Sequence, residues 1–300
     1  MSFDTDPARH QKVLATCGDV PAERPSFAIS LPEVGISNKT VWVTLPPGRL
    51  PFSLTLDVDL AADRRGIHMS RLEEAITLLH ERPFADLREY GVALLRETLR
   101  TQEANQGRVE LRGLLPWSRP AKVSGRISLD SLEISCRVEG CLPAPLLEIG
   151  VGVHHLTACP CTQAYNRVWF DLAAYPAPLA THSQRSFTTL RLSAAGDEAA
   201  ALPAYDELLA CLAAALHLTQ DLLKRPDEAE LVRQAHIQPQ FAEDAVRETA
   251  RAAGQCFGHL AAATRVVIES VSLESIHIHD VRCRLDTTLA AIRAAMTSGP

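Results

Sequence analysis

The sequence predicts an α+β fold in which a unit of two strands, two helices and two strands (ββααββ) occurs twice. Residues 40–45 and 52–60 alternate apolar and polar side chains around Pro46-Pro47-Gly48, as a half-buried antiparallel hairpin does. Two segments with the apolar spacing of helices follow, and period two then returns. The second half of the chain repeats this order of elements.

The first unit contains two helical segments separated by a proline. Ser70 and Glu73 have the spacing of a capping box and predict a helix start, and Leu72 and Ile76 lie on one face of that helix. Pro83 interrupts the pattern before helical spacing resumes over residues 84–95. Alternation at 109–112 and over 122–138 predicts the second pair of strands.

The second unit has its own strands and helices. Strand-like alternation covers residues 146–157, 186–192, 264–271 and 276–285, and helical spacing covers 206–224 and 240–255. The predicted organisation is therefore a mobile tail over residues 1–25, a first unit over 26–142 and a second unit over 143–300. The proline-containing stretch 140–145 connects the two units.

Composition places this chain among soluble globular proteins. It has 300 residues, of which 46% are hydrophobic and 22% charged, and no run of about 18 apolar residues that could span a membrane. The N-terminus lacks a signal peptide pattern, and the eight cysteines are too scattered for a disulfide framework. These features predict a cytoplasmic protein with no membrane partner, and the net charge of −6 argues against nucleic-acid binding.

Several side chains that bind metals occur in the second half. Cys159 and Cys161 are one residue apart, too close for the Cys-x-x-Cys pattern of structural zinc, and His182 follows in a polar segment. Glu228 lies in the first turn of a helix that Pro226 is expected to begin. On the residues alone, the two cysteines are either a source of one thiolate ligand or ordinary buried thiols around a proline turn.

His277 and His279 lie two residues apart in a predicted strand, which would point both imidazoles to the same face. Ser275 and Asp280 flank them and could orient an imidazole for ligation or proton transfer. The alternative is a histidine pair on a solvated face of the sheet.

Six motifs together resemble one enzyme family. They are GIHMSR at 66–71, CPC at 159–161, HSQR at 182–185, LLKRPDE at 222–228, FAED at 241–244 and ESIHIH at 274–279. In this order, across nearly the whole chain, they resemble the type IB GTP cyclohydrolases and their archaeal relatives. The resemblance implies the tunnelling fold and a homotetramer whose active sites lie between subunits.

The resemblance also implies the reaction and the metal. A member of this family opens the guanine imidazole ring of GTP at C8 with water, releases formate and forms 7,8-dihydroneopterin triphosphate. By motif position, Cys159, His182 and Glu228 correspond to the family's metal ligands. A sulfur, nitrogen and oxygen donor set suits zinc, iron or manganese and leaves a fourth position for water.

The remaining motif positions correspond to residues that act on GTP. Glu243 would accept hydrogen bonds from N1–H and N2–H of guanine, His277 or His279 would transfer protons, and Cys161 is a further catalytic candidate. Candidates for binding the rest of the substrate, with the basic ones directed to the triphosphate, are His68, Ser70, Arg71, Arg65, Gln184, Arg185, Lys224 and Arg225.

Two departures from the bacterial pattern leave alternatives open. The segment between Cys161 and His182 is longer than in many bacterial members, and residues 180–185 are closer to the archaeal form, whose expected product is 7,8-dihydroneopterin 2′,3′-cyclic phosphate. The tunnelling fold also hosts purine- or pterin-binding proteins with other chemistry. A nitrile reductase acting on a deazaguanine would need a nicotinamide, and the chain has no glycine-rich dinucleotide fingerprint.

Overall fold

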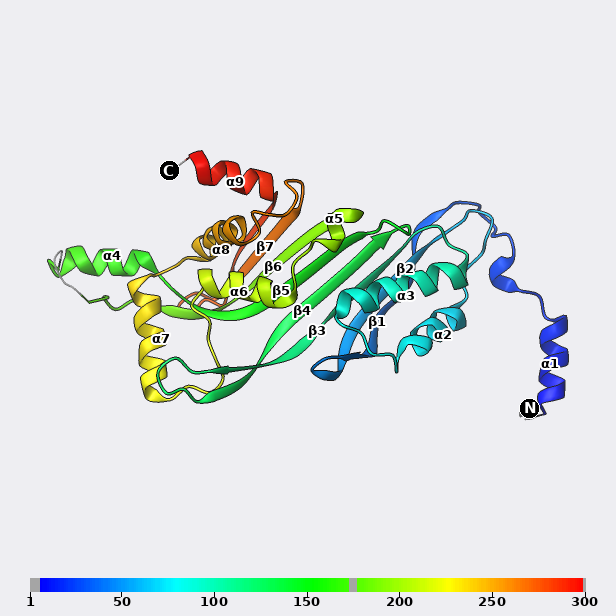
Figure 1. Cartoon of the computed structure of the whole chain (residues 1–300), viewed down its shortest axis with the longest axis horizontal. Coiled ribbons are helices and arrows are strands. Elements are labelled where there is room, and N and C mark those ends of the chain that lie inside the picture. Colours follow the sequence, from blue (N-terminus) through cyan, green and yellow to red (C-terminus); the bar gives the residue numbers. More distant parts are fainter. Residues whose placement is uncertain (1–5, 173–176, 299–300) are drawn as a thin grey trace.

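The computed structural model describes residues 6–172 and 177–298 and contains one antiparallel sheet of eight strands in the order of the chain (Figure 1). Each strand pairs with the next one in sequence, so the joint between the two halves, β4 to β5, is continuous. The strands are β1 (Leu31–Leu45), β2 (Gly48–Leu60), β3 (Gly107–Pro120), β4 (Ile127–Gly140), β5 (Leu146–Ala158), β6 (Ser183–Ala195), β7 (Arg265–Ser272) and β8 (Val281–Thr288).

The helices between the strands confirm the predicted ββααββ order, with additional helices in the second half. They are α1 (Pro7–Thr16), a short 3₁₀ helix (Val20–Ala22), α2 (Met69–Leu79), α3 (Leu87–Gln102), α4 (Pro160–Trp169), α5 (Asp197–Ala200), α6 (Tyr205–Ala215), α7 (Arg225–Ile237), α8 (Ala242–Cys256) and α9 (Leu289–Ser298). Over the described ranges, no helix is long and apolar enough to cross a membrane.

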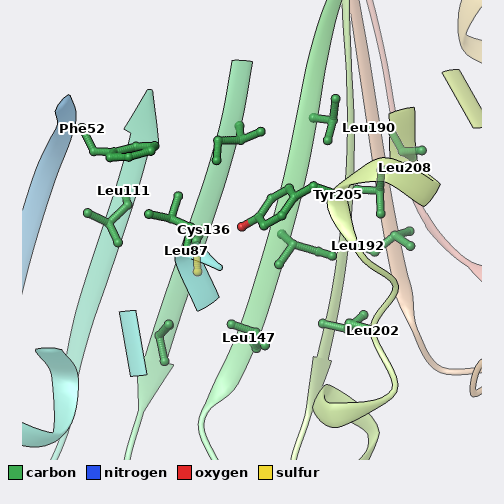
Figure 2. Close-up of a cluster of buried hydrophobic side chains, with 14 of the residues drawn as sticks. Phe52, Leu87, Leu111, Cys136, Leu147, Leu190, Leu192, Leu202, Tyr205 and Leu208 are labelled. Atoms are coloured by element: carbon green, nitrogen blue, oxygen red, sulfur yellow. The ribbon is translucent and has the colours of Figure 1, made fainter. Parts of the chain in front are cut away.

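The core lies between one face of the sheet and the helices that cover it. Every second residue of a strand points to this face, and in β2 these residues include Leu54 and Leu56, both fully buried. Figure 2 shows Tyr205 of α6 directed toward Cys136 of β4, and its hydroxyl donates to the Ser135 carbonyl (3.1 Å). The hydroxyl group is thereby satisfied inside an apolar layer.

Two helix starts in the first unit differ from the prediction. The helix expected to begin at a Ser70 capping box already includes Met69, and its N-cap residue, His68, makes no capping bond through its side chain. The capping box at Ser70 is therefore wrong. At α3 the cap is Asp86, whose side chain accepts from the backbone amides of Arg88 and Glu89.

Three predicted boundaries change because the chain makes other backbone bonds. The helix expected over 206–224 ends at Ala215, and the next residues bond to β5 instead, with Leu156 N donating to His217 O (2.9 Å). The strand expected from 122 begins at Ile127, since residues 121–126 form the turn after β3. The strand expected over 276–285 begins only at Val281. Apolar periodicity does not show where such pairings end.

The predicted tail contains the exposed helix α1, which the sequence pattern did not indicate. The Asp6 side chain accepts from the Ala8 amide (3.0 Å) at its start, with Pro7 in the first turn. None of the residues of α1 is buried.

Candidate functional site

Cys159 and His182 lie side by side although 22 residues separate them in the sequence. Ala158 at the end of β5 pairs with Ser183 at the start of β6, and the Cys159 amide donates to the His182 carbonyl (3.1 Å). Part of the long segment between them, residues 173–176, lies outside the described residues. Two of the three predicted metal ligands are thus brought together by the register of one strand pair.

The Cys159 side chain stands at the beginning of a helix. Cys159 is the N-cap residue of α4, Pro160 occupies the first turn, and the Thr162 hydroxyl donates to the Cys159 sulfur (3.9 Å). Cys161 lies within α4 and is exposed.

The His182 imidazole is held through one ring nitrogen. Its Nδ1 lies 3.1 Å from Gln184 Oε1, and an amide oxygen can only accept, so Nδ1 carries the proton. In the neutral imidazole the other nitrogen, Nε2, then carries the lone pair, which is the usual arrangement of metal-binding histidines.

A buried carboxylate that the sequence reasoning did not single out lies beside His182. Glu274 Oε2 is 4.0 Å from His182 Nδ1, and the Glu274 side chain is only 8% exposed. The available signal was its position at the start of the 274–279 motif, directly before the two histidines.

His277 and His279 belong to the connection between β7 and β8, so their predicted placement on a strand is wrong. Their rings are nevertheless stacked, with centroids 5.3 Å apart and planes 3° from parallel. The His277 ring also meets His182 edge-on, at 6.5 Å between centroids. The predicted grouping of these imidazoles is present, produced by a bent connection instead of strand alternation.

Glu228 has the predicted position in the first turn of α7, where it is exposed. Beside it, Asp227 accepts from the amides of Val123 (2.9 Å) and Ser124 (2.8 Å), which fixes the start of α7 against the turn after β3. Hydrogen bonds from Ser124, followed by those from the Val123 and Lys224 amides, lower the pKa of Asp227 to about 2.

The other end of α7 approaches the cysteine segment. Gln163 in α4 donates to the carbonyl of His236 (3.0 Å), and Glu228 is eight residues earlier, about 12 Å along the helix axis. Glu228 therefore does not join Cys159 and His182 within one chain. Among the residues that the structure describes, no group of three or more His, Cys, Asp or Glu side chains could hold a metal ion.

The other predicted residues of the second unit lie on the surface of the single chain. Glu243 is exposed in the first turn of α8, and Lys224 and Arg225 are exposed at the start of α7. Arg185 is exposed on β6, whereas Gln184, which alternates with it, is buried and faces His182.

The predicted residues of the first unit lie at the opposite end of the sheet. His68 contacts the end of α3, where Gln102 bonds both its amide and its carbonyl, close to the point where β3 begins. Through the pairings of β3, β4 and β5, this is the end at which β5 starts. Cys159 follows the other end of β5, about 40 Å away at the ~3.3 Å rise of a strand.

The basic residues at this end of the sheet, far from Cys159, make contacts within the chain. Arg65 pairs with Glu23 (2.9 Å), Arg71 donates to the Thr101 carbonyl (3.1 Å), and Ser70 is exposed in α2. One chain therefore carries two separate groups of predicted site residues, one at each end of the sheet.

A family model described as type I GTP cyclohydrolase folE2 matches residues 18–283. The chain belongs to this family. The folE2 match covers all six motifs, and members of the family are GTP cyclohydrolases by name. The broad prediction of a hydrolase of the GTP cyclohydrolase class is thereby confirmed.

Two curated relatives of this folE2-family chain come from archaea. GTP cyclohydrolase MptA of Methanocaldococcus jannaschii is 27% identical, covering 93% of this chain and 98% of its own length. The MptA protein of Thermoplasma volcanium is 31% identical, covering 87% and 92% respectively.

A solved structure supports the fold. Uricase from Arthrobacter globiformis matches with a TM-score of 0.52 at 9% identity, covering 85% of this chain and 93% of the uricase chain. At this identity the likeness concerns architecture alone, and it confirms the predicted tunnelling fold.

Proposed function

We propose that the chain is a metal-dependent type IB GTP cyclohydrolase, which opens the imidazole ring of GTP at C8 and releases formate to give 7,8-dihydroneopterin triphosphate. The observation that carries the proposal is the contact between Cys159 and His182, with His182 Nε2 free to ligate and the His277 and His279 rings beside it. Family membership supplies the substrate class.

The donors fit part of a catalytic metal site. A thiol from Cys159 and an imidazole from His182 are ligands that zinc, iron and manganese accept, and Glu228 is the proposed third ligand. Because Glu228 is distant within one chain, it would reach the site by a shift of α7 or from a second copy. The bound metal would supply an activated water at neutral pH.

Side chains of this protein would bind and orient the substrate. Glu243 would accept the N1–H and N2–H groups of guanine, and His277 or His279 would deliver a proton to the departing ring nitrogen. Cys161 is a further catalytic candidate. Basic and polar residues would hold the triphosphate and ribose, namely His68, Ser70, Arg71, Arg65, Gln184, Arg185, Lys224 and Arg225.

The separation of the two residue groups supports a site shared between copies of the chain. The first-unit and second-unit groups lie about 40 Å apart in one chain, too far to contact one nucleotide. The sheet also ends in β1 and β8, whose outer edges offer unpaired backbone groups to another copy. A homotetramer acting in the cytoplasm is the assembly we propose.

A second candidate product is the 2′,3′-cyclic phosphate. It is favoured by the archaeal relatives and by residues 180–185, which resemble the archaeal form of the motif. Both products require the same opening at C8, so they differ only in the treatment of the phosphates.

The test is a GTP turnover assay on protein purified without chelators or immobilised nickel. Formate release should depend on added zinc, iron or manganese, and mass spectrometry of the pterin should distinguish the triphosphate from the cyclic phosphate. Cys159→Ala should abolish formate release, whereas Cys256→Ala, at an exposed cysteine on α8, should not. Metal-loaded wild-type protein that releases no formate from GTP would contradict the proposed function and favour a binding protein of the same fold.

A further inference from the structure

Three hydroxyl side chains form a buried cluster behind the candidate site. Thr157 of β5, Ser186 of β6 and Ser272 of β7 occupy neighbouring strands on the helix-covered face, and each is at most 1% exposed. Positions on the same face that lie farther from Cys159, such as Val151, Leu190 and Ile268, are apolar. The sheet therefore changes from apolar to polar toward its Cys159 and His182 end.

The hydroxyl groups bond to one another. Thr157 Oγ1 lies 2.8 Å from Ser186 Oγ and 3.4 Å from Ser272 Oγ, and Ser272 donates to Glu274 Oε1 (3.0 Å). Because Ser272 has one proton and gives it to the carboxylate, it can only accept from Thr157. Thr157 in turn accepts from Ser186, so the chain of bonds has one direction and ends on Glu274.

The same cluster reaches the second group that faces His182. The single Thr157 hydroxyl proton has two acceptors within reach, Ser272 Oγ (3.4 Å) and the backbone carbonyl of Gln184 (3.3 Å), and is shared between them as in a three-centre hydrogen bond. The Gln184 side-chain oxygen Oε1 accepts from His182 Nδ1. Both residues that face this nitrogen are thus linked to the cluster, Gln184 through its backbone carbonyl to Thr157 and Glu274 through its carboxylate to Ser272.

Packing alone does not account for this arrangement. A buried hydroxyl costs free energy unless it is hydrogen-bonded, whereas valine or alanine on these strands would need no partner. Three such groups on three strands are satisfied at once only when Glu274 and Gln184 keep their present positions.

We propose that the hydroxyl cluster of Thr157, Ser186 and Ser272 positions Glu274 and Gln184, and through them fixes the His182 imidazole with Nε2 directed to its ligand. The inference rests on the proposed function, since it assigns that ligand as the metal ion. Thr157, Ser186 and Ser272 act through other side chains and are positioning residues.

The fold supplies a matched control one step deeper in the sheet. His155, Thr188 and Ser270 form a second buried polar row, in which His155 Nε2 lies 2.8 Å from Thr188 Oγ1 and Thr188 donates to Ser270 (2.8 Å). Ser270 and Ser272 lie on the same face of β7, both buried and both hydrogen-bonded. Of the two, Ser272 is the one bonded to Glu274.

The experiment compares Ser272→Ala with Ser270→Ala in the full-length protein. Cobalt affinity is measured by chelator competition, through the charge-transfer absorption of the Cys159 thiolate, together with the thermal midpoint, kcat and KM. We expect Ser272→Ala to weaken cobalt binding about 10-fold or more, as loss of an outer hydrogen bond does at metal sites. Ser270→Ala should lower the thermal midpoint about as much as Ser272→Ala does, but it should leave cobalt affinity unchanged.

A second pair tests the cluster without changing its volume. Thr157→Val removes the hydroxyl at nearly constant size and should also weaken cobalt binding. Thr157→Ser keeps the hydroxyl and should bind cobalt as the wild-type protein does. Equal cobalt affinity in the Ser270 and Ser272 variants, or a wild-type protein that binds no cobalt, would overturn the inference. Wild-type protein that binds cobalt through Cys159 but releases no formate would overturn the proposed function and leave the comparison of affinities valid.

Discussion

Strand β2 of the first unit and strand β5 of the second both pack against helices, yet their core-facing residues differ. In β2 these residues are apolar along the strand, from Phe52 to Leu60. In β5 they are apolar from Leu147 to Val153 and then become His155 and Thr157, both fully buried. An apolar face is sufficient to pack helices on a sheet. The polar end of β5 is therefore best explained by the candidate site that follows it.

The largest expected effect on this difference between the strands comes from a change at His182. In His182→Ala the imidazole donor is lost, and we expect GTP turnover to fall by about 10³-fold or more, because the proposed metal could no longer supply an activated water. The metal content measured by elemental analysis should fall with it. His259→Ala, at an exposed histidine after α8, is the control and should keep both. Normal metal content and turnover in His182→Ala would contradict the placement of the metal site in the second unit.

Mixed assemblies test whether the first unit supplies the other half of the site. Arg71→Ala and His182→Ala should each be inactive, because each removes a proposed site residue. In one chain the two residues lie at opposite ends of the sheet. After joint unfolding and refolding of the two variants, about one quarter of the sites should contain both intact residues if each site takes one from each chain. Formate release by the mixture measures this recovery. A mixture as inactive as its parents would argue against shared sites.

Glu243→Gln tests the guanine contact. Gln keeps the size of Glu but presents a donor where guanine also presents donors. Losing one hydrogen bond to a charged group costs roughly 1.5–3 kcal/mol, so GTP affinity or turnover should fall about 10- to 100-fold with metal content unchanged. Glu248→Gln, at a half-exposed residue of the same helix that pairs with Arg251, is the control. If GTP kinetics are unaffected, Glu243 is the solvent-facing residue that it is in the single chain.

The buried polar row predicts a pH dependence of stability. Burial lowers the pKa of His155 from its ordinary 6.5 to about 3, so the folded protein keeps this imidazole neutral while the unfolded chain takes up a proton. Stability from this group is complete above pH 6.5 and decreases as the pH falls toward 3, by about 1.4 kcal/mol per pH unit. The free energy of unfolding, measured in urea at pH 7 and at pH 5, should differ less between the two pH values in His155→Gln than in the wild-type protein. An identical pH difference in the variant would show that another group is responsible.

The smallest expected effect is a difference in unfolding free energy between variants at the starts of α2 and α3 in the first unit. Asp86 caps α3 through two backbone amides, so Asp86→Ala should cost about 1 kcal/mol of unfolding free energy. Ser70→Ala should change the free energy of unfolding by less than about 0.5 kcal/mol, because α2 has no side-chain cap. Urea midpoints measure both. A larger loss for Ser70→Ala would mean that the predicted capping box exists after all.

The sequence by itself determined most of the sheet and the kinds of side chain available for chemistry. Alternation reports which face of a strand is buried, so β2, β5 and β7 are recognised from local pattern. It failed where local pattern does not decide, as after Ala215, where an apolar helical period continues but the backbone bonds to β5.

What only the tertiary structure decided is which of these side chains meet. The register of β5 on β6 brings Cys159 to His182, and the connection after β7 adds Glu274 and the two histidines. The same topology sends His68 and Arg71 to the far end of the sheet and keeps Glu228 apart. Such proximities depend on pairings between distant segments, whose register is set by the burial of whole strands and not by the residues of the site.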